Sequence, residues 1–351
     1  MKETIDKWLT AAFQMKASDV HLTVGMPPVI RINGELKKYG EQKLTPEDTE
    51  EVAKAVIPPG QYDRFVEKGE LDFSYSIPGV SRFRMNAYHQ RSCISLAVRI
   101  IPTSIPTLEE LDLPVVLRQL SRRPHGLVLV TGPTGSGKST TLAAMINEMN
   151  HTMKRHIITL EDPIEYLHKH QTCIIDQREV GFDTRNFANG LRAALRQDPD
   201  VILVGEMRDL ETISTAITAA ETGHLVLGTL HTSSAPATVE RIIDVFPPEQ
   251  QGQIRIQLAS VLVGIISQRL FPTPDRKSRK AVTEILINNS AVANLIRNDK
   301  IYQIHNVMQT SRASGMHTFE MSILQAFEKQ LILKEEALVY LEERGLAYGT
   351  V

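Results

Sequence analysis

Residues 132–139 combine the residue types needed to hold a polyphosphate. They read Gly-Pro-Thr-Gly-Ser-Gly-Lys-Ser and match the G-x-x-x-x-G-K-[ST] phosphate-loop pattern at every fixed position. Glycines at positions 135 and 137 let successive backbone N–H groups converge on phosphate oxygens, and the helix that follows adds its positive end. Lys138 can reach the β- and γ-phosphates, and the Ser139 hydroxyl can ligate Mg²⁺. The pattern therefore predicts a site for a nucleoside triphosphate with Mg²⁺.

The segments on either side of this loop support the prediction. An apolar run at Leu127–Val130 precedes the loop, and an amphipathic helix is expected over Thr140–Met149. A chance glycine-rich turn, which is the alternative, has no reason to lie between a strand and a helix. The predicted nucleotide contacts are Gly132, Pro133, Thr134, Gly135, Ser136, Gly137, Lys138, Ser139 and Thr140.

Glu206 is the predicted catalytic base. It follows the apolar strand Val201–Val204, where a carboxylate across from a phosphate loop can orient or deprotonate the attacking water. The alternative is a solvated glutamate at a strand end. Gly205 stands where many phosphate-loop enzymes have an aspartate beside the metal. We therefore expect Ser139, phosphate oxygens and water to hold Mg²⁺, with carboxylates one layer further out.

Three acidic residues lie within five positions: Glu161, Asp162 and Glu165. They would repel one another unless a cation or basic groups lie nearby. We expect Glu161 and Asp162 to order the metal ion and the attacking water. The alternative is the start of a helix or turn, where acidic side chains favour the N-terminus.

Two histidines flank the strand expected at Leu225–Leu230. Seven residues of extended chain place His224 and His231 roughly 23 Å apart. His231 lies at the carboxyl end of the strand with the other site residues, and it could sense the γ-phosphate. His224 lies at the opposite end, which favours a structural role or a place at a subunit surface.

Arginines form the last group of candidates. Arg82 and Arg84 share one face of an expected strand, and Arg99 lies opposite the apolar residues of the next strand. Arginines on the polar face of a sheet are often simply solvated. The functional alternative is that they supply positive charge to a triphosphate across a subunit boundary, as arginine fingers do.

From about residue 113 onward, apolar strands alternate with helices, which predicts a mostly parallel α/β sheet. In such a sheet, ligands bind outside the carboxyl ends of the strands. All four strands that can be identified end in candidate site residues. These strands are Leu127–Thr131, His156–Leu160, Val201–Val204 and Leu225–Leu230. After a polar, basic loop at Pro272–Lys280, we expect helices, most clearly at Ala291–Asn298 and Thr318–Glu328.

The first hundred residues predict a small α+β domain. Ile5, Trp8 and Leu9 lie on one face of an opening helix, and Asn33-Gly34 predicts a hairpin between two short strands. A helix is expected to start at Thr45 and to stop at Pro58-Pro59, before three further strands. We therefore expect domains at residues 1–100 and 113–351, joined by a linker at 101–112.

Bulk composition excludes several classes of protein. The formal net charge is −2 over 351 residues, without the basic surplus typical of nucleic-acid binding. No apolar stretch approaches the roughly 20 residues that a spanning helix needs, and the N-terminus lacks a signal-peptide pattern. Cys93 and Cys173 are the only cysteines and have no metal-site spacing. We expect a soluble cytoplasmic protein that binds no nucleic acid.

Taken together, these motifs resemble the secretion-ATPase superfamily of ring motors, and within it the type IV pilus retraction ATPases. The resemblance covers essentially the whole chain. Its residues are Ala17–Leu22, Arg82–Asn86, Gly132–Thr140, Ile158–Glu165 (the family's Asp box), Pro199–Asp209 (its Walker B) and Gly223–His231 (its His box).

The resemblance implies a PAS-like N-terminal domain, a RecA-like ATPase domain with C-terminal helices, and ATP with Mg²⁺ bound between the subunits of a homohexamer. It implies work at the cytoplasmic face of the inner membrane, peripheral to the bilayer, with a pilus platform protein and the pilus machinery as partners. It assigns function to both histidines of the His box. It also makes Arg84 and Arg99 candidates for completing a neighbouring subunit's site.

The chain departs from the family at a C-terminal helix. Retraction ATPases carry Ala-Ile-Arg-Asn-Leu-Ile-Arg there, whereas Ala291–Arg297 reads Ala-Val-Ala-Asn-Leu-Ile-Arg, so Ala293 replaces the first arginine. The short chain and the absence of a tetracysteine insert favour retraction over a pilus-assembly or type II secretion ATPase. The sequence also leaves open a retraction-accessory paralogue, a slowly hydrolysing nucleotide-binding regulator and a DNA translocase.

Overall fold

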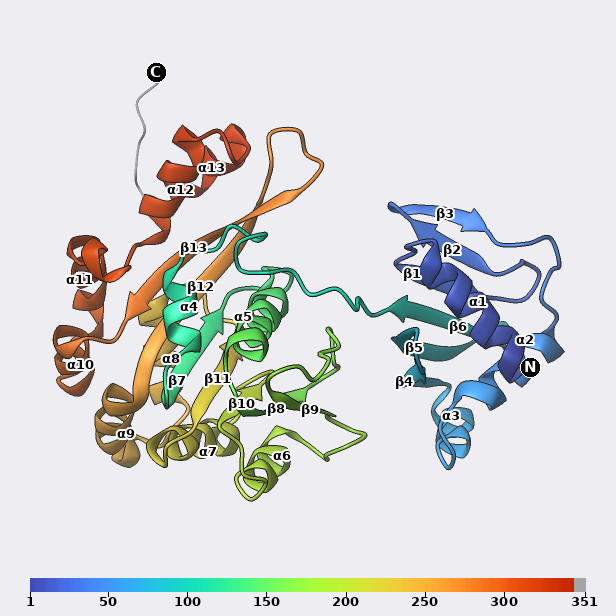
Figure 1. The fold of residues 1–351 in the computed structure, drawn as a ribbon, viewed down its shortest axis with the longest axis horizontal. Coiled ribbons are helices and arrows are strands. Elements are labelled where there is room, and N and C mark those ends of the chain that lie inside the picture. The colour runs from blue at the N-terminus through green and yellow to red at the C-terminus, as the bar shows by residue number, and fades with distance from the viewer. Residues whose placement is uncertain (344–351) are drawn as a thin grey trace. The chain divides into compact units, whose positions relative to one another are not determined.

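The computed structural model describes residues 1–343, which divide into two compact units. The first consists of residues 1–104 and a short piece at 165–167, and the second of 105–164 and 168–343. Figure 1 shows a sheet with helices in each unit. This confirms the predicted mixed α/β class. No helix among residues 1–343 is long and apolar enough to cross a membrane.

The first unit is built on an antiparallel sheet of six strands in the order β3-β2-β1-β6-β5-β4. A two-residue turn at Asn33-Gly34 joins β2 to β3, with both residues at positive φ, as the sequence predicts. The strands are β1 (Asp19–Leu22), β2 (Val29–Ile32), β3 (Glu35–Lys38), β4 (Glu70–Ile77), β5 (Ser81–Gln90) and β6 (Cys93–Ile100).

Three helices bury one face of this sheet. They are α1 (Lys2–Gln14), α2 (Pro46–Val56) and α3 (Tyr62–Lys68). Thr45 and Asp48 form a reciprocal capping box at the start of α2, which is why the helix begins where predicted. The seven-residue α3 was not predicted, since it is too short to show a clear period. The opposite face of β5 and β6 carries polar side chains, including Arg84 and Arg99.

The second unit contains a seven-stranded sheet in the order β13-β12-β7-β11-β10-β8-β9. Six strands run parallel, and β13 is antiparallel to β12. The strands are β7 (Gly126–Thr131), β8 (His156–Glu161), β9 (Ile174–Glu179), β10 (Val201–Val204), β11 (Leu225–Leu230), β12 (Leu262–Pro272) and β13 (Arg279–Ile287). The four strands that the sequence predicts are β7, β8, β10 and β11.

Both faces of this sheet are covered, which explains why its central strands are apolar throughout. Leu127 and Leu129 of β7 pack in one core with α6 to α10, whereas Val128 and Val130 pack in another core with α4 and α5. The helices are α4 (Val116–Ser121), α5 (Lys138–Thr152), α6 (Phe187–Ala194), α7 (Leu210–Glu221), α8 (Ala235–Asp244), α9 (Pro248–Val261) and α10 (Ser290–Arg297).

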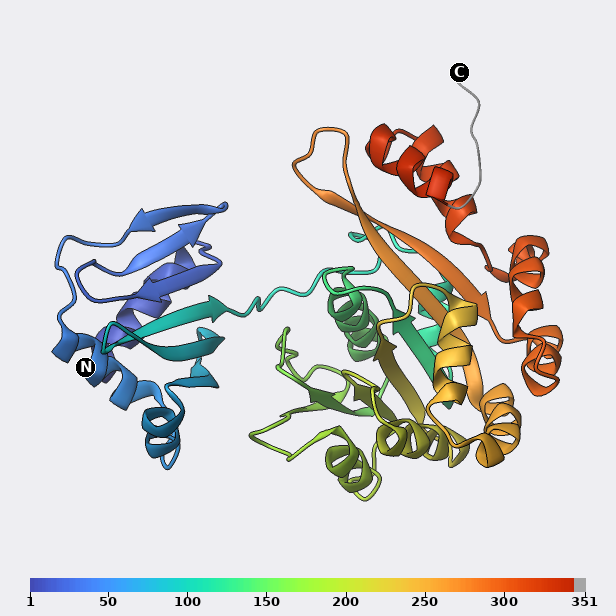
Figure 2. The ribbon, with the colours of Figure 1, turned by 180° about the vertical axis from the view of Figure 1, so that it is seen from behind.

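The C-terminal region confirms the predicted helices but corrects the prediction in between. Figure 2 shows β12 and β13 as one long hairpin, with α8 against the sheet beside them. The expectation of helices directly after residue 280 was therefore wrong, because Arg279–Ile287 pairs with β12 along its whole length. The remaining helices are α11 (Ile304–Thr310), α12 (Phe319–Glu328) and α13 (Lys334–Glu343).

Candidate active site

The phosphate loop joins β7 to α5, as its sequence pattern requires. Lys138 is the first residue of α5, and the first turn of the helix contains no acidic side chain. The first N–H groups and the positive end of the helix therefore face the loop without a competing carboxylate. Lys138 Nζ donates to the carbonyl oxygens of Gly132, at 2.8 Å, and Pro133, at 3.2 Å.

Glycine is required at two loop positions because β12 packs directly against the loop. A Cβ at Gly132 would lie 2.3 Å from the carbonyl oxygen of Gln268, and a Cβ at Gly137 would lie 2.7 Å from the side-chain nitrogen of Gln268. Gly137 also has a φ of 89°, which L side chains rarely adopt. The pattern's glycines therefore serve close packing as well as access to phosphate.

Glu206 lies next to an imidazole and a guanidinium group. Its Oε1 is 2.7 Å from His231 Nε2, and the same oxygen accepts a hydrogen bond from Arg208 Nε. The parallel pairing of β10 with β11 brings Glu206 and His231 together, because each residue follows its strand by one or two positions. The Glu206 side chain is 20% exposed, so a water molecule can reach it.

Gly205 has a steric reason to be glycine. A Cβ at this position would lie 2.9 Å from the carbonyl oxygen of Leu160 and 3.3 Å from Glu161 Cα on the neighbouring strand. An aspartate cannot occupy the position without moving β8. Thr229 Oγ1 also donates to the Gly205 carbonyl at 2.5 Å, which fixes the backbone just before Glu206.

The acidic segment after β8 does not gather into a metal cluster. Glu161 Oε1 accepts hydrogen bonds from Thr159 Oγ1 at 2.6 Å and from Gln177 Nε2 at 3.1 Å, while Asp162 and Glu165 are exposed. Within residues 1–343, no group of three or more His, Cys, Asp or Glu side chains is arranged to hold a metal ion. Ser139 lies in the first turn of α5, where the phosphate-loop pattern places a hydroxyl ligand for Mg²⁺.

The two histidines lie at opposite ends of β11, as the strand length requires. His224 Nδ1 is 3.0 Å from the carbonyl oxygen of Ala219 and 3.3 Å from Thr222 Oγ1, so its ring lies at the C-terminal end of α7. His231 contacts Glu206 instead, with 43% of its side chain exposed. The structure thus brings only His231 to the carboxyl ends of the strands.

The three candidate arginines belong to the first unit. Arg84 on β5 lies directly opposite Arg99 on β6, and Arg99 Nε is 3.3 Å from Asp19 Oδ1 on β1. Like charges at opposed positions of a sheet are unfavourable, and the aspartate offsets only part of this repulsion. Arg82 lies two residues from Arg84 on the same face of the strand.

Sequence reasoning missed the buried polar residues around the site. Gln268 on β12 is 2% exposed and contacts the phosphate loop, and Glu179 on β9, also 2% exposed, accepts from the backbone N–H of Ile164. Arg208 has no signal of its own beyond its place in the Walker B segment. The available signal for Gln268 was a single amide within the apolar run of β12.

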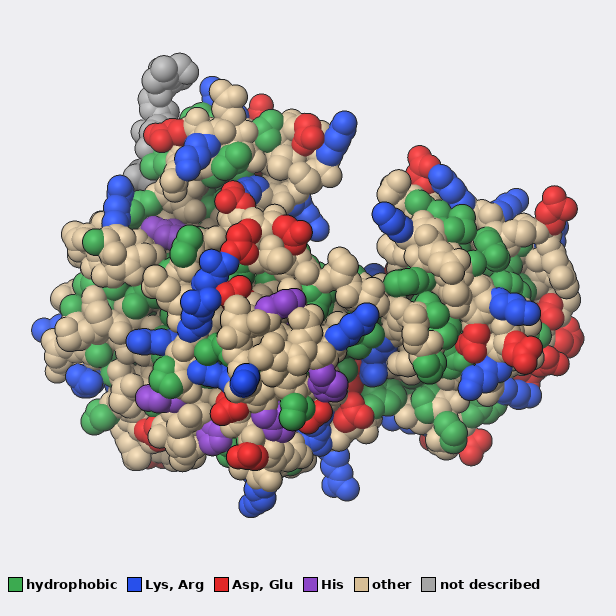
Figure 3. Space-filling model, in the orientation of Figure 1, with side chains coloured by type: hydrophobic (Ala, Val, Ile, Leu, Met, Phe, Trp, Pro, Cys, Tyr) green, Lys and Arg blue, Asp and Glu red, His purple; other side chains and the backbone are tan. Residues whose placement is uncertain are grey.

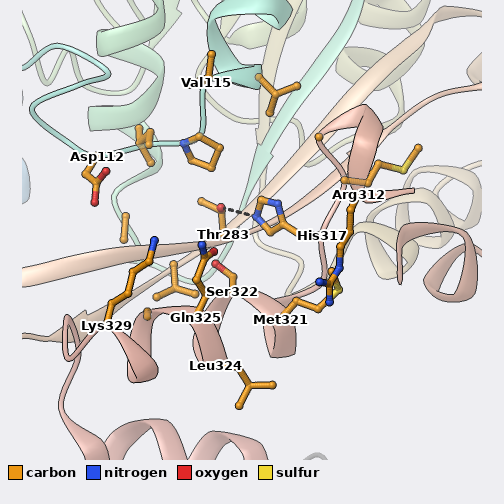
Figure 4. Close-up of a pocket in the computed structure, with 18 of the residues that line it drawn as sticks. Asp112, Val115, Thr283, Arg312, His317, Met321, Ser322, Leu324, Gln325 and Lys329 are labelled. Carbon is orange, nitrogen blue, oxygen red and sulfur yellow. Dashed lines mark hydrogen bonds between the residues drawn. The ribbon is translucent and has the colours of Figure 1, made fainter. Parts of the chain in front are cut away.

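A separate pocket of about 1090 Å³ lies between the segment before α4, strand β13 and helix α12 (Figure 4). Thr283 Oγ1 and His317 Nε2 are 3.0 Å apart there, with Asp112 and Val115 on one side and, on the other, Gln325 of α12 and Lys329 just after it. Burial lowers the pKa of His317. None of the predicted site residues lines this pocket.

Comparison with known proteins yields a family and several relatives. The family described as type II/IV secretion system protein matches residues 67–344. The type IV pilus retraction ATPase PilT of Pseudomonas aeruginosa is 46% identical over 333 residues, which is 95% of this chain and 96% of PilT. A twitching motility protein of Neisseria gonorrhoeae is 48% identical over 310 residues, 88% of this chain and 83% of that protein.

A solved structure of the pilus retraction motor PilT with bound ADP has the same fold. It superposes with a TM-score of 0.87 at 48% identity, covering 97% of this chain and 96% of that chain. The likeness therefore spans both units.

Proposed function

The chain belongs to the type II/IV secretion system protein family, and we propose that it is an ATP-hydrolysing motor that powers the retraction of type IV pili. One observation carries the proposal: the likeness to a pilus retraction ATPase extends over 95% of the chain, both units included. The phosphate loop, with Glu206 and His231 on the neighbouring parallel strands, supplies the residues that hydrolysis needs.

We assign the phosphate loop to nucleotide binding. Lys138 leaves the carbonyl oxygens of Gly132 and Pro133 for the β- and γ-phosphates, where its charge is needed more. The backbone N–H groups of the loop and of Thr140 hold the remaining phosphate oxygens, and the Ser139 hydroxyl holds Mg²⁺. The metal ion, when bound, neutralises part of the phosphate charge.

Glu206 is the proposed general base. It removes a proton from the water whose oxygen attacks the γ-phosphorus, while the bond to the β-phosphate oxygen breaks and ADP leaves. His231 and Arg208 hold Oε1 of this carboxylate and so orient the proposed base. His231 also responds to the γ-phosphate of bound ATP, since that phosphate competes with Glu206 for the same imidazole. Glu161 and Asp162 order water around the metal.

The active assembly is proposed to be a homohexamer in which Arg84 and Arg99 act on the nucleotide of a neighbouring subunit. Two arginines opposed across a strand pair carry a surplus of positive charge, which an anionic phosphate would offset. The motor would work in the cytoplasm at the inner-membrane face, docked on a pilus platform protein. On the face of the molecule in Figure 3, acidic and basic side chains are interspersed, unlike a nucleic-acid-binding stripe.

The direction of the motor is tested by deleting the gene and scoring pili on the cells. Surplus pili with lost twitching motility are expected for a retraction motor, whereas bald cells would show an assembly ATPase. ATP turnover by the purified protein, with and without DNA, tests the other classes. A regulator would turn over ATP very slowly, and a translocase would be stimulated by DNA.

A further inference from the structure

The side chain of Gln268 is buried between two parts of the phosphate-binding element. It lies on β12, is 2% exposed, and uses both ends of its amide. Nε2 donates to the carbonyl oxygen of Ser136 at 2.7 Å, and Oε1 accepts from Thr141 Oγ1 at 2.7 Å. The carbonyl of Ser136 can only accept, so the NH₂ group of the amide must face it.

An amide at this depth has an energetic cost. Leaving it without hydrogen-bond partners would destabilise the fold, and an apolar side chain would fill the same space in β12 without that cost. Gln268 is hydrogen-bonded at both polar ends, through Nε2 to the loop and through Oε1 to α5. The side chain therefore connects β12 to the phosphate loop.

Planarity of the peptide bond gives the connection a direct consequence for phosphate binding. In a trans peptide, the C=O of Ser136 and the N–H of Gly137 point in opposite directions. The carbonyl of Ser136 is held toward Gln268, inside the protein. The N–H of Gly137 is therefore held toward the other side, where a phosphate loop presents its donors.

We propose that Gln268 is a positioning residue that fixes the orientation of the Ser136–Gly137 peptide so that its N–H is ready for a phosphate of ATP. Through Thr141 the same side chain ties this peptide to α5, so loop and helix keep one relative geometry before nucleotide binds. The inference rests on the proposed nucleotide binding. It adds β12 to the elements that build the site.

Two substitutions of nearly equal volume test the proposal. Gln268→Glu keeps an acceptor for Thr141 but places a carboxylate oxygen against the carbonyl of Ser136, and Gln268→Met removes both hydrogen bonds. For each, we expect the Kd for Mg-ATP, measured by isothermal titration calorimetry, to rise about tenfold, the scale of one lost hydrogen bond. KM should rise in parallel, while kcat should change by less than about threefold, because Glu206 is untouched.

Thr141→Val separates the two contacts. It removes only the hydrogen bond to Oε1, so the loss of affinity should be smaller than in Gln268→Met. Adding Thr141→Val to Gln268→Met should lower affinity no further, because the contact is already gone. A full additional loss in the double variant would contradict a shared contact.

Ser267→Ala is the matched control. Ser267 is the adjacent residue on β12, equally buried, and its hydroxyl is 2.9 Å from Thr131 Oγ1. The control should lower the Tm by a similar amount and leave the Kd for Mg-ATP within about twofold of wild type. Unchanged affinity in Gln268→Met, or an equal loss of affinity in Ser267→Ala, would overturn the proposal. If the wild-type protein binds ATP without hydrolysing it, the proposed function fails while the Kd comparison still tests Gln268.

Discussion

Glu206, the proposed catalytic base, is held by two neighbouring side chains. His231 and Arg208 both contact its Oε1, so one oxygen of the carboxylate is fixed in place. The second oxygen is left for water. His231 can contact Glu206 only because β10 and β11 are adjacent and parallel, so that the two residues lie at the same edge of the sheet.

Replacing Glu206 by glutamine keeps the shape of the side chain and removes its basicity. We expect near-normal ATP affinity and turnover slowed at least ~10²-fold, the usual scale for a lost general base. Phosphate release and nucleotide binding would be measured on the same preparation. Glu211→Gln, which changes an exposed glutamate paired with Arg192 on the surface, should leave both unchanged. Lys138→Ala should impair binding and turnover together, and near wild-type turnover in Glu206→Gln would exclude it as the base.

His168 gives the protein an acid-sensitive position. Burial lowers its pKa to about 4, so the folded protein keeps this ring neutral where an unfolded chain protonates it near 6.5. The unfolded state therefore binds more protons between those values, and stability falls as pH drops from 6.5 toward 4. The free energy of unfolding should fall by roughly 3 kcal/mol less between pH 7 and pH 4 in His168→Gln than in wild type, measured by urea unfolding at both pH values.

His156 should make stability change with pH in the opposite direction to His168. Burial lowers its pKa, but hydrogen bonds to the Asp176 carboxylate and the Asp198 carbonyl outweigh this and raise the pKa overall. Its contribution is present below the unfolded value and is lost as pH rises through the folded value. His156→Gln should thus deepen the loss on acidification. Identical pH profiles for the two variants would contradict the assigned environments.

At the scale of single residues, sequence identified what is contiguous and missed what is assembled by folding. The phosphate loop, Glu206 and His231 could be predicted as candidates because a local pattern or a strand end marks each of them. Gln268 was missed because its partner, Ser136, lies 132 residues away and because an amide in an apolar strand carries no local signal. The steric reason for Gly205 likewise depends on the neighbouring β8.

At the scale of elements, β13 was missed because the middle of the strand is buried on both faces. Residues 282–286 of β13 are all buried, Thr283 and Glu284 included, so no alternation of polar and apolar residues marks the strand. The buried Glu284 carboxylate is stabilised there because it accepts a hydrogen bond from the backbone N–H of Ala235 at the start of α8. The four parallel strands were easier to predict, since each is an apolar run with a turn or loop signal after it.

Helix α10 shows a clear division between a packing face and an outer face. Val292 and Ile296 are fully buried against α9 and its neighbours, Ala293 is 7% exposed, and Arg297 is exposed. Leu295 is half-buried at the edge of the same core. An arginine at position 293, as in retraction ATPases, would therefore replace a residue that is nearly buried here. A surface of α10 that couples the motor to the pilus machinery would have to lie on the outer face, where Arg297 is exposed.

Substitutions on the two faces of α10 should separate folding from coupling. Ile296→Ala should lower the free energy of unfolding by about 2–5 kcal/mol and reduce ATP turnover with it. Arg297→Ala should leave Tm and turnover nearly unchanged but abolish pilus retraction, scored as surplus pili and lost twitching. Normal twitching with Arg297→Ala would leave α10 as a packing helix only. Leu295→Ala, at the boundary, should show an intermediate loss of stability.

At the scale of the whole molecule, the residues proposed for the chemistry are divided between two units. The phosphate loop, Glu206 and His231 belong to the second, and the opposed arginines belong to the first. Arg31, Asp19, Arg99 and Arg84 form one row across β2, β1, β6 and β5, with three positive charges against one negative charge. A motor that converts hydrolysis into movement needs the first unit to respond to the nucleotide, and charge on its exposed sheet face provides a means.

Mixed rings test whether that charge acts between subunits. Arg84→Ala and Arg99→Ala should each bind ATP normally and hydrolyse it slowly, because arginine fingers stabilise charge that develops in the transition state. Each of these variants, like Glu206→Gln, should show only slow turnover alone. When Arg99→Ala and Glu206→Gln subunits are mixed, some interfaces pair an intact arginine with an intact base, so part of the activity should return.

Arg31→Ala is the control, since Arg31 lies in the same row and its Nε is 3.9 Å from Asp19 Oδ2. If mass measurements confirm mixed rings and no ratio restores turnover, the arginines serve only the first unit's own sheet. If Arg31→Ala is as slow as Arg99→Ala, the effect belongs to the charge of the whole face and not to a finger that reaches the γ-phosphate.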